Sequence, residues 1–126
     1  MNHNHEHNNS PHKDLLHILA QCADECDHCF DACLENKRTD QLVRALRACR
    51  DCAKICRVTE SFVASNSTFA QRMTELCAEV CKMCADICDN HTEEEQETMH
   101  CAKICRECEE ACRNYKSGNV AVPSVD

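Results

Sequence analysis

The sequence predicts an all-α protein, an antiparallel up-down-up-down four-helix bundle with a cysteine-lined core. A twelve-residue repeat with the spacing C-x3-C-x2-C-x3-C occurs four times, and its offsets of 0, 4, 7 and 11 place the marked positions in a stripe about 60° wide on one helix face. The one glycine, Gly118, and the two prolines, Pro11 and Pro123, lie outside the repeats. Short connections after Leu34 and after Cys88 make consecutive helices antiparallel.

Each predicted helix contains one repeat. The first is expected over about residues 11–36, with Ser10 as N-cap and Pro11 in the first turn. The second is expected over about 40–64, followed by a turn at 65–67.

The third and fourth helices are each expected to begin with a capping box, a Thr followed three residues later by Gln or Glu. These begin at Thr68 and Thr92 and predict helices over about 68–90 and 92–115. At 126 residues the chain is expected to form one domain, the bundle at 13–115. A disordered His-rich N-terminal tail is expected at 1–12, and a flexible C-terminal tail at 116–126.

Composition excludes several kinds of partner. The formal net charge of -8 leaves no basic stripe to neutralise phosphates, so no nucleic-acid partner is expected. No stretch approaches the roughly 18 consecutive apolar residues of a transmembrane helix, so no membrane partner is expected either. The polar first residues lack the apolar segment of a secretory signal, and we expect a reducing, cytoplasmic location.

Fifteen of the sixteen repeat positions are cysteine, and Ala45 takes the other. Antiparallel helices would align these positions in four flat layers: Cys22, Cys56, Cys77 and Cys112; Cys26, Cys52, Cys81 and Cys108; Cys29, Cys49, Cys84 and Cys105; and Cys33, Ala45, Cys88 and Cys101. The core positions beyond the first layer are mostly apolar (Leu15, Ile18, Thr59, Val63, Ala70, Met73 and Tyr115), and those beyond the last are mostly polar (Asn36, Leu42, His91, Glu97 and Thr98).

The cysteine pattern favours metal binding over a disulfide scaffold. The odd number of cysteines leaves one unpaired in a monomer, and helix axes about 8–10 Å apart separate many opposed thiols too far for an unstrained disulfide. Soft thiolate ligands select Cu(I), zinc or iron–sulfur clusters. Zinc and iron–sulfur motifs are usually carried on loops, whereas these cysteines lie mid-helix. Multiple Cu(I) ions are therefore the predicted ligand. Burial should raise the thiol pKa values and keep the metal-free core neutral.

Other functions compete with metal storage. Cysteine can serve as a small buried hydrophobe, but cysteines at fifteen aligned positions would pack a bundle poorly. A thiol–disulfide oxidoreductase needs CxxC at a helix start beside a strand, and no strand is predicted. A di-iron enzyme needs inward-facing Glu-x-x-His pairs, which the predicted core lacks. A zinc-binding structural or metal-sensing module would hold about three ions. We therefore predict no enzyme activity.

The repeated cysteine helices resemble the bacterial copper storage proteins, specifically their cytosolic branch, over residues 14–115. The resemblance implies that all fifteen cysteines are Cu(I) ligands, that copper passes through one open end of the bundle, and that the protein is a homotetramer serving copper donors and acceptors. Ala45 departs from the pattern, so its layer is expected to bind fewer or weaker ions. At the polar end, His91 and His100 are our candidates for residues that admit the metal.

Overall fold

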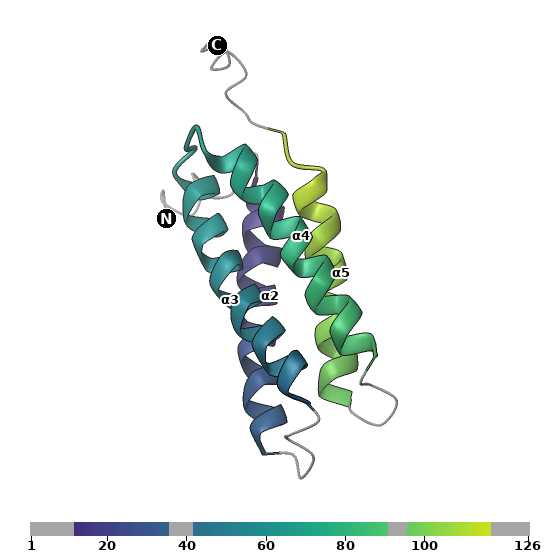
Figure 1. Ribbon diagram of the computed structural model, residues 1–126. Helices are drawn as coiled ribbons and strands as arrows, with labels where there is room; N and C mark the ends of the chain where they lie inside the picture. Colours follow the sequence, from purple (N-terminus) through teal and green to yellow (C-terminus); the bar gives the residue numbers. More distant parts are fainter. Residues whose placement is uncertain (1–11, 36–41, 91–95, 117–126) are drawn as a thin grey trace.

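Four antiparallel helices form the part of the chain that the computed structural model describes, residues 12–35, 42–90 and 96–116. They are α2 (Lys13–Leu34), α3 (Val43–Ala64), α4 (Ala70–Asp89) and α5 (Gln96–Arg113). Each helix packs against the next one along the chain, and α5 packs against α2. These contacts close an elongated bundle (Figure 1). The predicted all-α bundle is confirmed.

The turn between α3 and α4 differs from the prediction at the start of α4. Asn66 adopts a φ of 56°, a left-handed conformation that asparagine tolerates better than most residues. The Ser67 hydroxyl then accepts a hydrogen bond from the Phe69 backbone N–H at 3.0 Å. As a result α4 begins at Ala70, and the predicted capping box at Thr68 is wrong.

The other predicted starts cannot be compared in the same way. Ser10, Pro11 and Thr92 lie outside the described residues, as do 36–41 and most of both predicted tails, so the division at 1–12 and 116–126 stays a prediction. The described part of α2 begins at Lys13, and α3 ends at Ala64 as expected.

Cysteine fills the middle of the core. All fifteen cysteines are buried, with at most 4% of any one exposed, and Ala45 is fully buried beside them. The apolar end is completed by Leu15, Leu19, Thr59, Val63, Ala70, Thr74 and Tyr115. Leu19 and Thr74 continue the helical spacing of the cysteines, whereas Ile18 and Met73, which we expected there, are only partly buried.

Three of the five residues expected at the opposite end are described in the structure. Leu42 and Thr98 are buried there as expected, but Glu97 is exposed and does not face the core. Asn36 and His91 lie outside the described residues.

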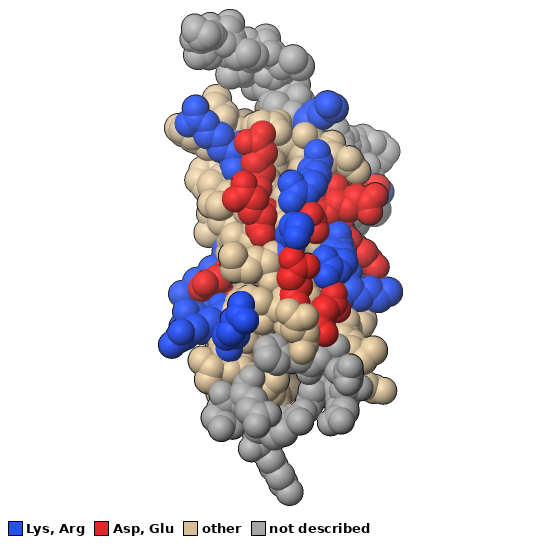
Figure 2. All heavy atoms as spheres, turned by 45° about the vertical axis from the view of Figure 1, so that its right-hand side comes forward, with Lys and Arg blue, Asp and Glu red and all other residues tan. Residues whose placement is uncertain are grey.

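Ion pairs of arginine cross the α2–α3 seam and the α4–α5 seam. Arg57 of α3 bonds two aspartates of α2, and Arg106 of α5 bonds Asp86 and Asp89 of α4. Figure 2 shows the interleaved acidic and basic side chains on the face formed by α4 and α5. Because these groups are about half exposed, each pair contributes at most about 1 kcal/mol. Within the described ranges, no helix combines the length and apolarity needed to cross a bilayer.

Candidate metal centre

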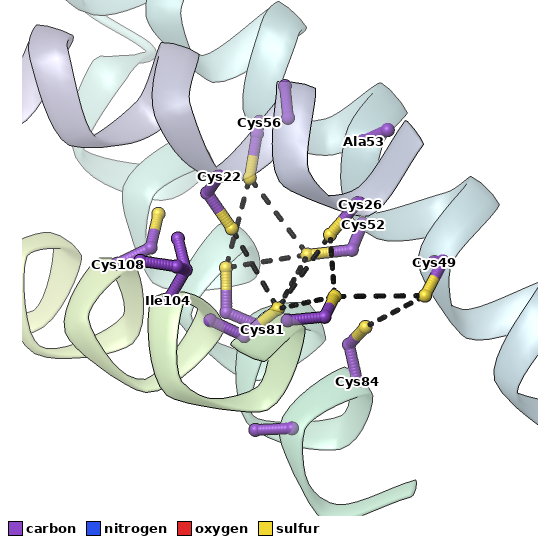
Figure 3. Close-up of a cluster of buried hydrophobic side chains, with 14 of the residues drawn as sticks. Cys22, Cys26, Cys49, Cys52, Ala53, Cys56, Cys81, Cys84, Ile104 and Cys108 are labelled. Atoms are coloured by element: carbon purple, nitrogen blue, oxygen red, sulfur yellow. Dashed lines mark hydrogen bonds between the residues drawn. The ribbon is translucent and has the colours of Figure 1, made fainter. Parts of the chain in front are cut away.

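The cysteine sulfurs converge on the bundle interior from all four helices. Figure 3 shows Cys22, Cys52 and Cys81, from three different helices, directing their sulfurs toward one another. All fifteen cysteines are free thiols. Cys26 and Cys105 have sulfurs 3.7 Å apart, far beyond the roughly 2.05 Å of a disulfide bond. The interior is therefore lined with unbonded thiols in contact with one another.

The sulfurs form a continuous network along the bundle axis. Separations of 3.7 to 4.0 Å join neighbours both within a helix and between helices. The cysteines joined in this way are Cys22, Cys26, Cys49, Cys52, Cys56, Cys77, Cys81, Cys84, Cys88, Cys101 and Cys105. An ion bound at one point of such a network can exchange thiolate ligands step by step along it.

The network is staggered and does not follow the flat layers predicted from the sequence. Between α3 and α4 the prediction is correct, since Cys56 and Cys77 have sulfurs 3.8 Å apart. Between α2 and α5 it is wrong: Cys22 contacts Cys105 at 3.8 Å, where the flat layers paired it with Cys112.

The stagger shows that the helices are displaced lengthwise relative to one another. Between α3 and α4, sulfurs meet in the same predicted layer or the next one, as Cys56 does with Cys77 and Cys81. The displacement is larger where α5 meets α2, because Cys22 meets Cys105 two layers away. Cys26 in turn contacts α5 sulfurs at two levels, those of Cys101 and Cys105.

Five groups of four sulfurs each lie close enough together to surround a metal ion, with all sulfurs of a group within 4.8 Å of one another. The groups are Cys22, Cys52, Cys56 and Cys81; Cys22, Cys26, Cys52 and Cys105; Cys26, Cys84, Cys101 and Cys105; Cys29, Cys49, Cys88 and Cys101; and Cys56, Cys77, Cys81 and Cys108. Thirteen different cysteines make up these twenty positions, so seven are shared between two groups. Occupancy of all five groups at once thus requires bridging thiolates.

Sulfur spacing alone does not select the metal. A metal–thiolate bond of about 2.3 Å places the sulfurs about 3.8 Å apart around a tetrahedral ion and about 4.0 Å apart around a trigonal ion. The sulfur separations of 3.7 to 4.0 Å cover both arrangements. Zinc and Cu(I) differ instead in how many ions one chain can hold. At most three of the five groups share no cysteine with one another, so closed four-thiolate zinc sites are limited to three.

Two cysteines lie outside these groups. Cys112 is 1% exposed at the apolar end, and Cys33 is 4% exposed near the opposite end. Sequence reasoning assigned both as ligands, and that role stays a prediction. Of the candidate access residues, His91 lies outside the described residues. His100 is on the outer surface between α5 and α2, where its Nε2 lies 3.6 Å from Oε1 of Glu25.

Contact between thiols changes how they hold their protons. Hydrogen bonds to Cys101 and Cys105, together with burial, raise the pKa of Cys26 far above that of a free thiol. The pKa of Cys101 is instead lowered, because hydrogen bonds from Cys105 and Cys26 stabilise its thiolate. The expected rise in pKa therefore holds for Cys26 but not for every thiol. A thiolate in this core is stabilised by neighbours that stay protonated, and those neighbours must lose their protons when a metal binds.

Comparisons with known proteins point to one family. Residues 8–117 match the protein-family model of the copper storage proteins. A Bacillus subtilis protein known as the uncharacterized cysteine-rich protein YhjQ is 34% identical over 79 residues, which is 63% of this chain and 73% of that protein.

Solved structures agree in fold and in helix arrangement. The Cu(I)-bound copper storage protein BsCsp3 of Bacillus subtilis superposes with a TM-score of 0.75 and 32% identity, over 80% of this chain and 93% of that one. The copper storage protein Ccsp of Streptomyces lividans, loaded with 10 copper equivalents, superposes with a TM-score of 0.78 and 29% identity, over 81% of this chain and 80% of that one. A second solved structure from Streptomyces lividans is that of a cytosolic copper storage protein.

Proposed function

The chain belongs to the copper storage protein family, and from this we propose that it stores multiple Cu(I) ions in the cytoplasm, bound by the thiolates of its core. One observation carries the proposal: thirteen of the buried sulfurs form five four-sulfur groups, and each group shares at least one cysteine with another. Shared thiolates let one chain hold more ions than separate sites would allow. All fifteen cysteines are the proposed ligands.

The chemistry of the core supports Cu(I) as the stored ion. Thioether and thiolate sulfur are the ligands that soft Cu(I) prefers, and the described core offers fifteen thiols. The similarity to a Cu(I)-bound structure and to one loaded with 10 copper equivalents supports the same ion and multiple occupancy. A cytoplasmic location keeps thiols reduced, and it is supported by the description of the Streptomyces protein as cytosolic.

A storage role also suits the uniformity of the site better than catalysis does. The cysteines are alike in burial, and each contributes a sulfur to an interior that excludes water. We propose that copper donors load this interior and that copper acceptors empty it. His91 and His100 stay our predicted access residues.

Anaerobic titration with Cu(I) tests the proposed function directly. We expect the reduced chain to withdraw copper from a competing Cu(I) chelator well beyond three equivalents, because bridging thiolates remove the limit set by separate four-cysteine sites. Uptake is measured from the absorbance of the copper–chelator complex, and bound copper is then counted after gel filtration. The four-cysteine groups of the same chain should hold about three Zn²⁺ ions. Copper uptake that also ends at about three equivalents would contradict a storage role.

We also propose that the chain forms a homo-oligomer, with the tetramer implied by the family resemblance. A second stripe on α4 supports this, because its residues repeat with the heptad spacing of helices that pack together. The stripe consists of Phe69, Met73, Leu76, Val80, Met83 and Ile87. Three of these are substantially exposed, namely Phe69 (56%), Leu76 (45%) and Met83 (61%). If α4 packed antiparallel against α4 of a second copy, the two stripes would bring apolar side chains together along their whole length.

Charge introduced into the α4 stripe should prevent assembly. The double substitution Leu76→Glu with Met83→Glu is expected to reduce the molar mass in solution, measured by light scattering during gel filtration, to that of the monomer. The control is Met99→Glu, because Met99 is also 50% exposed but belongs to α5 and is not part of the stripe. An unchanged mass for the double variant would show that copies associate elsewhere, and a monomeric parent would show that they do not associate.

A further inference from the structure

The outer seam between α2 and α5 carries a repeated motif that the cysteine core does not explain. Glu25 and His28 on α2 form a Glu-x-x-His pair, and Glu97 and His100 on α5 form another. Residues three apart lie on the same helix face, so each pair presents a carboxylate and an imidazole together. Because α2 and α5 are antiparallel neighbours, the two pairs lie opposite each other.

The structure brings the four side chains to one place. Glu25, His28, Glu97 and His100, with Gln96, line a surface cavity of about 240 Å³. Nε2 of His100 lies 3.6 Å from Oε1 of Glu25, whose side chain is only 17% exposed. The cavity has room for an ion and several waters, each of which occupies about 30 Å³ in the liquid.

An isolated ion pair accounts for only half of this arrangement. It would explain the contact between His100 and Glu25, but it assigns no role to His28 and Glu97, which line the same cavity. Two imidazoles and two carboxylates together form a borderline-to-hard donor set. Such a set suits zinc and similar divalent transition metals, whereas the soft thiolate core suits Cu(I).

We propose that this seam binds one zinc-like divalent metal ion, with His28 and His100 as nitrogen ligands and Glu25 and Glu97 as oxygen ligands. The site goes beyond copper storage and does not depend on it, since it lies outside the sulfur network and uses none of the cysteines. Two carboxylates balance the charge of the ion when both imidazoles are neutral.

Two of the four ligand atoms already lie near the geometry of a metal site. Around a tetrahedral zinc ion with bonds of about 2.0 to 2.1 Å, ligand atoms lie about 3.3 Å apart. The 3.6 Å separation between Glu25 and His100 is already close to this value. The side chains of His28 and Glu97 are exposed and can turn inward without disturbing the core. The partly buried Glu25 supplies the fixed side of the site.

Nitrogen-15 NMR of the histidine rings tests the site, because it reports on these side chains whether or not thiols also take up zinc. The full-length chain is used in reduced form, with His3, His5 and His7 replaced by Asn so that the N-terminal histidines add no signal. Zn²⁺ is added until the ring shifts stop changing. We expect the rings of His28 and His100 to shift together in one saturating step, while the exposed His17 of α2 does not shift.

The variant His28→Ala should weaken the zinc-induced shift of His100 more than about tenfold in zinc concentration, since even indirect partners of metal ligands change affinity by about 10 to 100-fold. His17→Ala is the matched control on the same helix and should leave the shift unchanged. Helix content from circular dichroism checks that each variant is folded. If His28 and His100 do not respond to zinc, or if His100 responds equally in His28→Ala, the proposed site is wrong. Neither result would bear on copper uptake by the cysteines.

Discussion

Copper loading is expected to raise the midpoint of thermal unfolding of the reduced protein by at least about 20 °C. A ligand that binds only the folded state at about a thousand times its dissociation constant stabilises that state by about 4 kcal/mol. Three or more such ions would add at least about 12 kcal/mol, and each kcal/mol shifts the midpoint of a domain of this size by several degrees. The shift is measured by circular dichroism under anaerobic conditions, with and without saturating Cu(I).

The metal-free protein should be the weaker form because of what fills its core. Cysteines occupy the central positions of all four helices, and a cysteine buries less apolar surface than the leucine usual at such positions. Leucine is confined to the ends, at Leu15, Leu19, Leu42 and Leu46. Removing copper with a strong Cu(I) chelator should return the midpoint to its starting value. A midpoint that does not respond to copper would mean that the ions bind outside the folded core.

The cysteine spacing was sufficient to predict the helices and the direction in which they face. Offsets of 0, 4, 7 and 11 fit only a helix, and four such stripes can be buried together only in a bundle. The same spacing extends to Leu19 and Thr74, which are buried at positions where we had expected Ile18 and Met73, so the prediction was wrong at these two positions. Local periodicity determines which face of a helix is buried, and this part of the prediction is confirmed.

The lengthwise register of the helices was not available from the repeats. Flat layers follow if every helix is aligned at its first cysteine, but helices that cross at an angle meet their neighbours at different levels. The contact of Cys22 with Cys105 in place of Cys112 is the result. The start of α4 was missed for a local reason, since the side chain of Ser67 bonds the Phe69 N–H and the capping box at Thr68 does not form.

The proposed metal site between α2 and α5 was not predicted, although the sequence contains the two Glu-x-x-His pairs that form it. Two Glu-x-x-His pairs are visible at Glu25 and Glu97, but nothing in their spacing shows that they face each other across antiparallel helices. Glu97 was instead expected at a core position, and it is exposed. Because the pairing depends on the neighbour relations of the helices, it needed the fold before it could be recognised.

Replacing one central cysteine is expected to lower the number of bound Cu(I) ions more than replacing a peripheral cysteine on the same helix. Cys105 has its sulfur within 4.0 Å of the sulfurs of Cys22, Cys26, Cys52 and Cys101 and belongs to two of the four-sulfur groups. Cys112 belongs to none of these groups. Cys105→Ala should therefore lower capacity by about two ions, because each group that contains this thiolate loses a bridging ligand. Cys112→Ala should lower it by about one ion or less.

The two variants form a matched pair, because Cys105 and Cys112 are both on α5 and both almost fully buried. Either substitution removes one sulfur and leaves a cavity of similar size, so differences in folding should be small. Bound copper is counted after anaerobic loading and gel filtration, and helix content is checked for each variant. Equal losses from the two variants would mean that every thiolate contributes independently. In that case the bridging network would not govern capacity, and the ions would be held by separate pairs of cysteines along each helix.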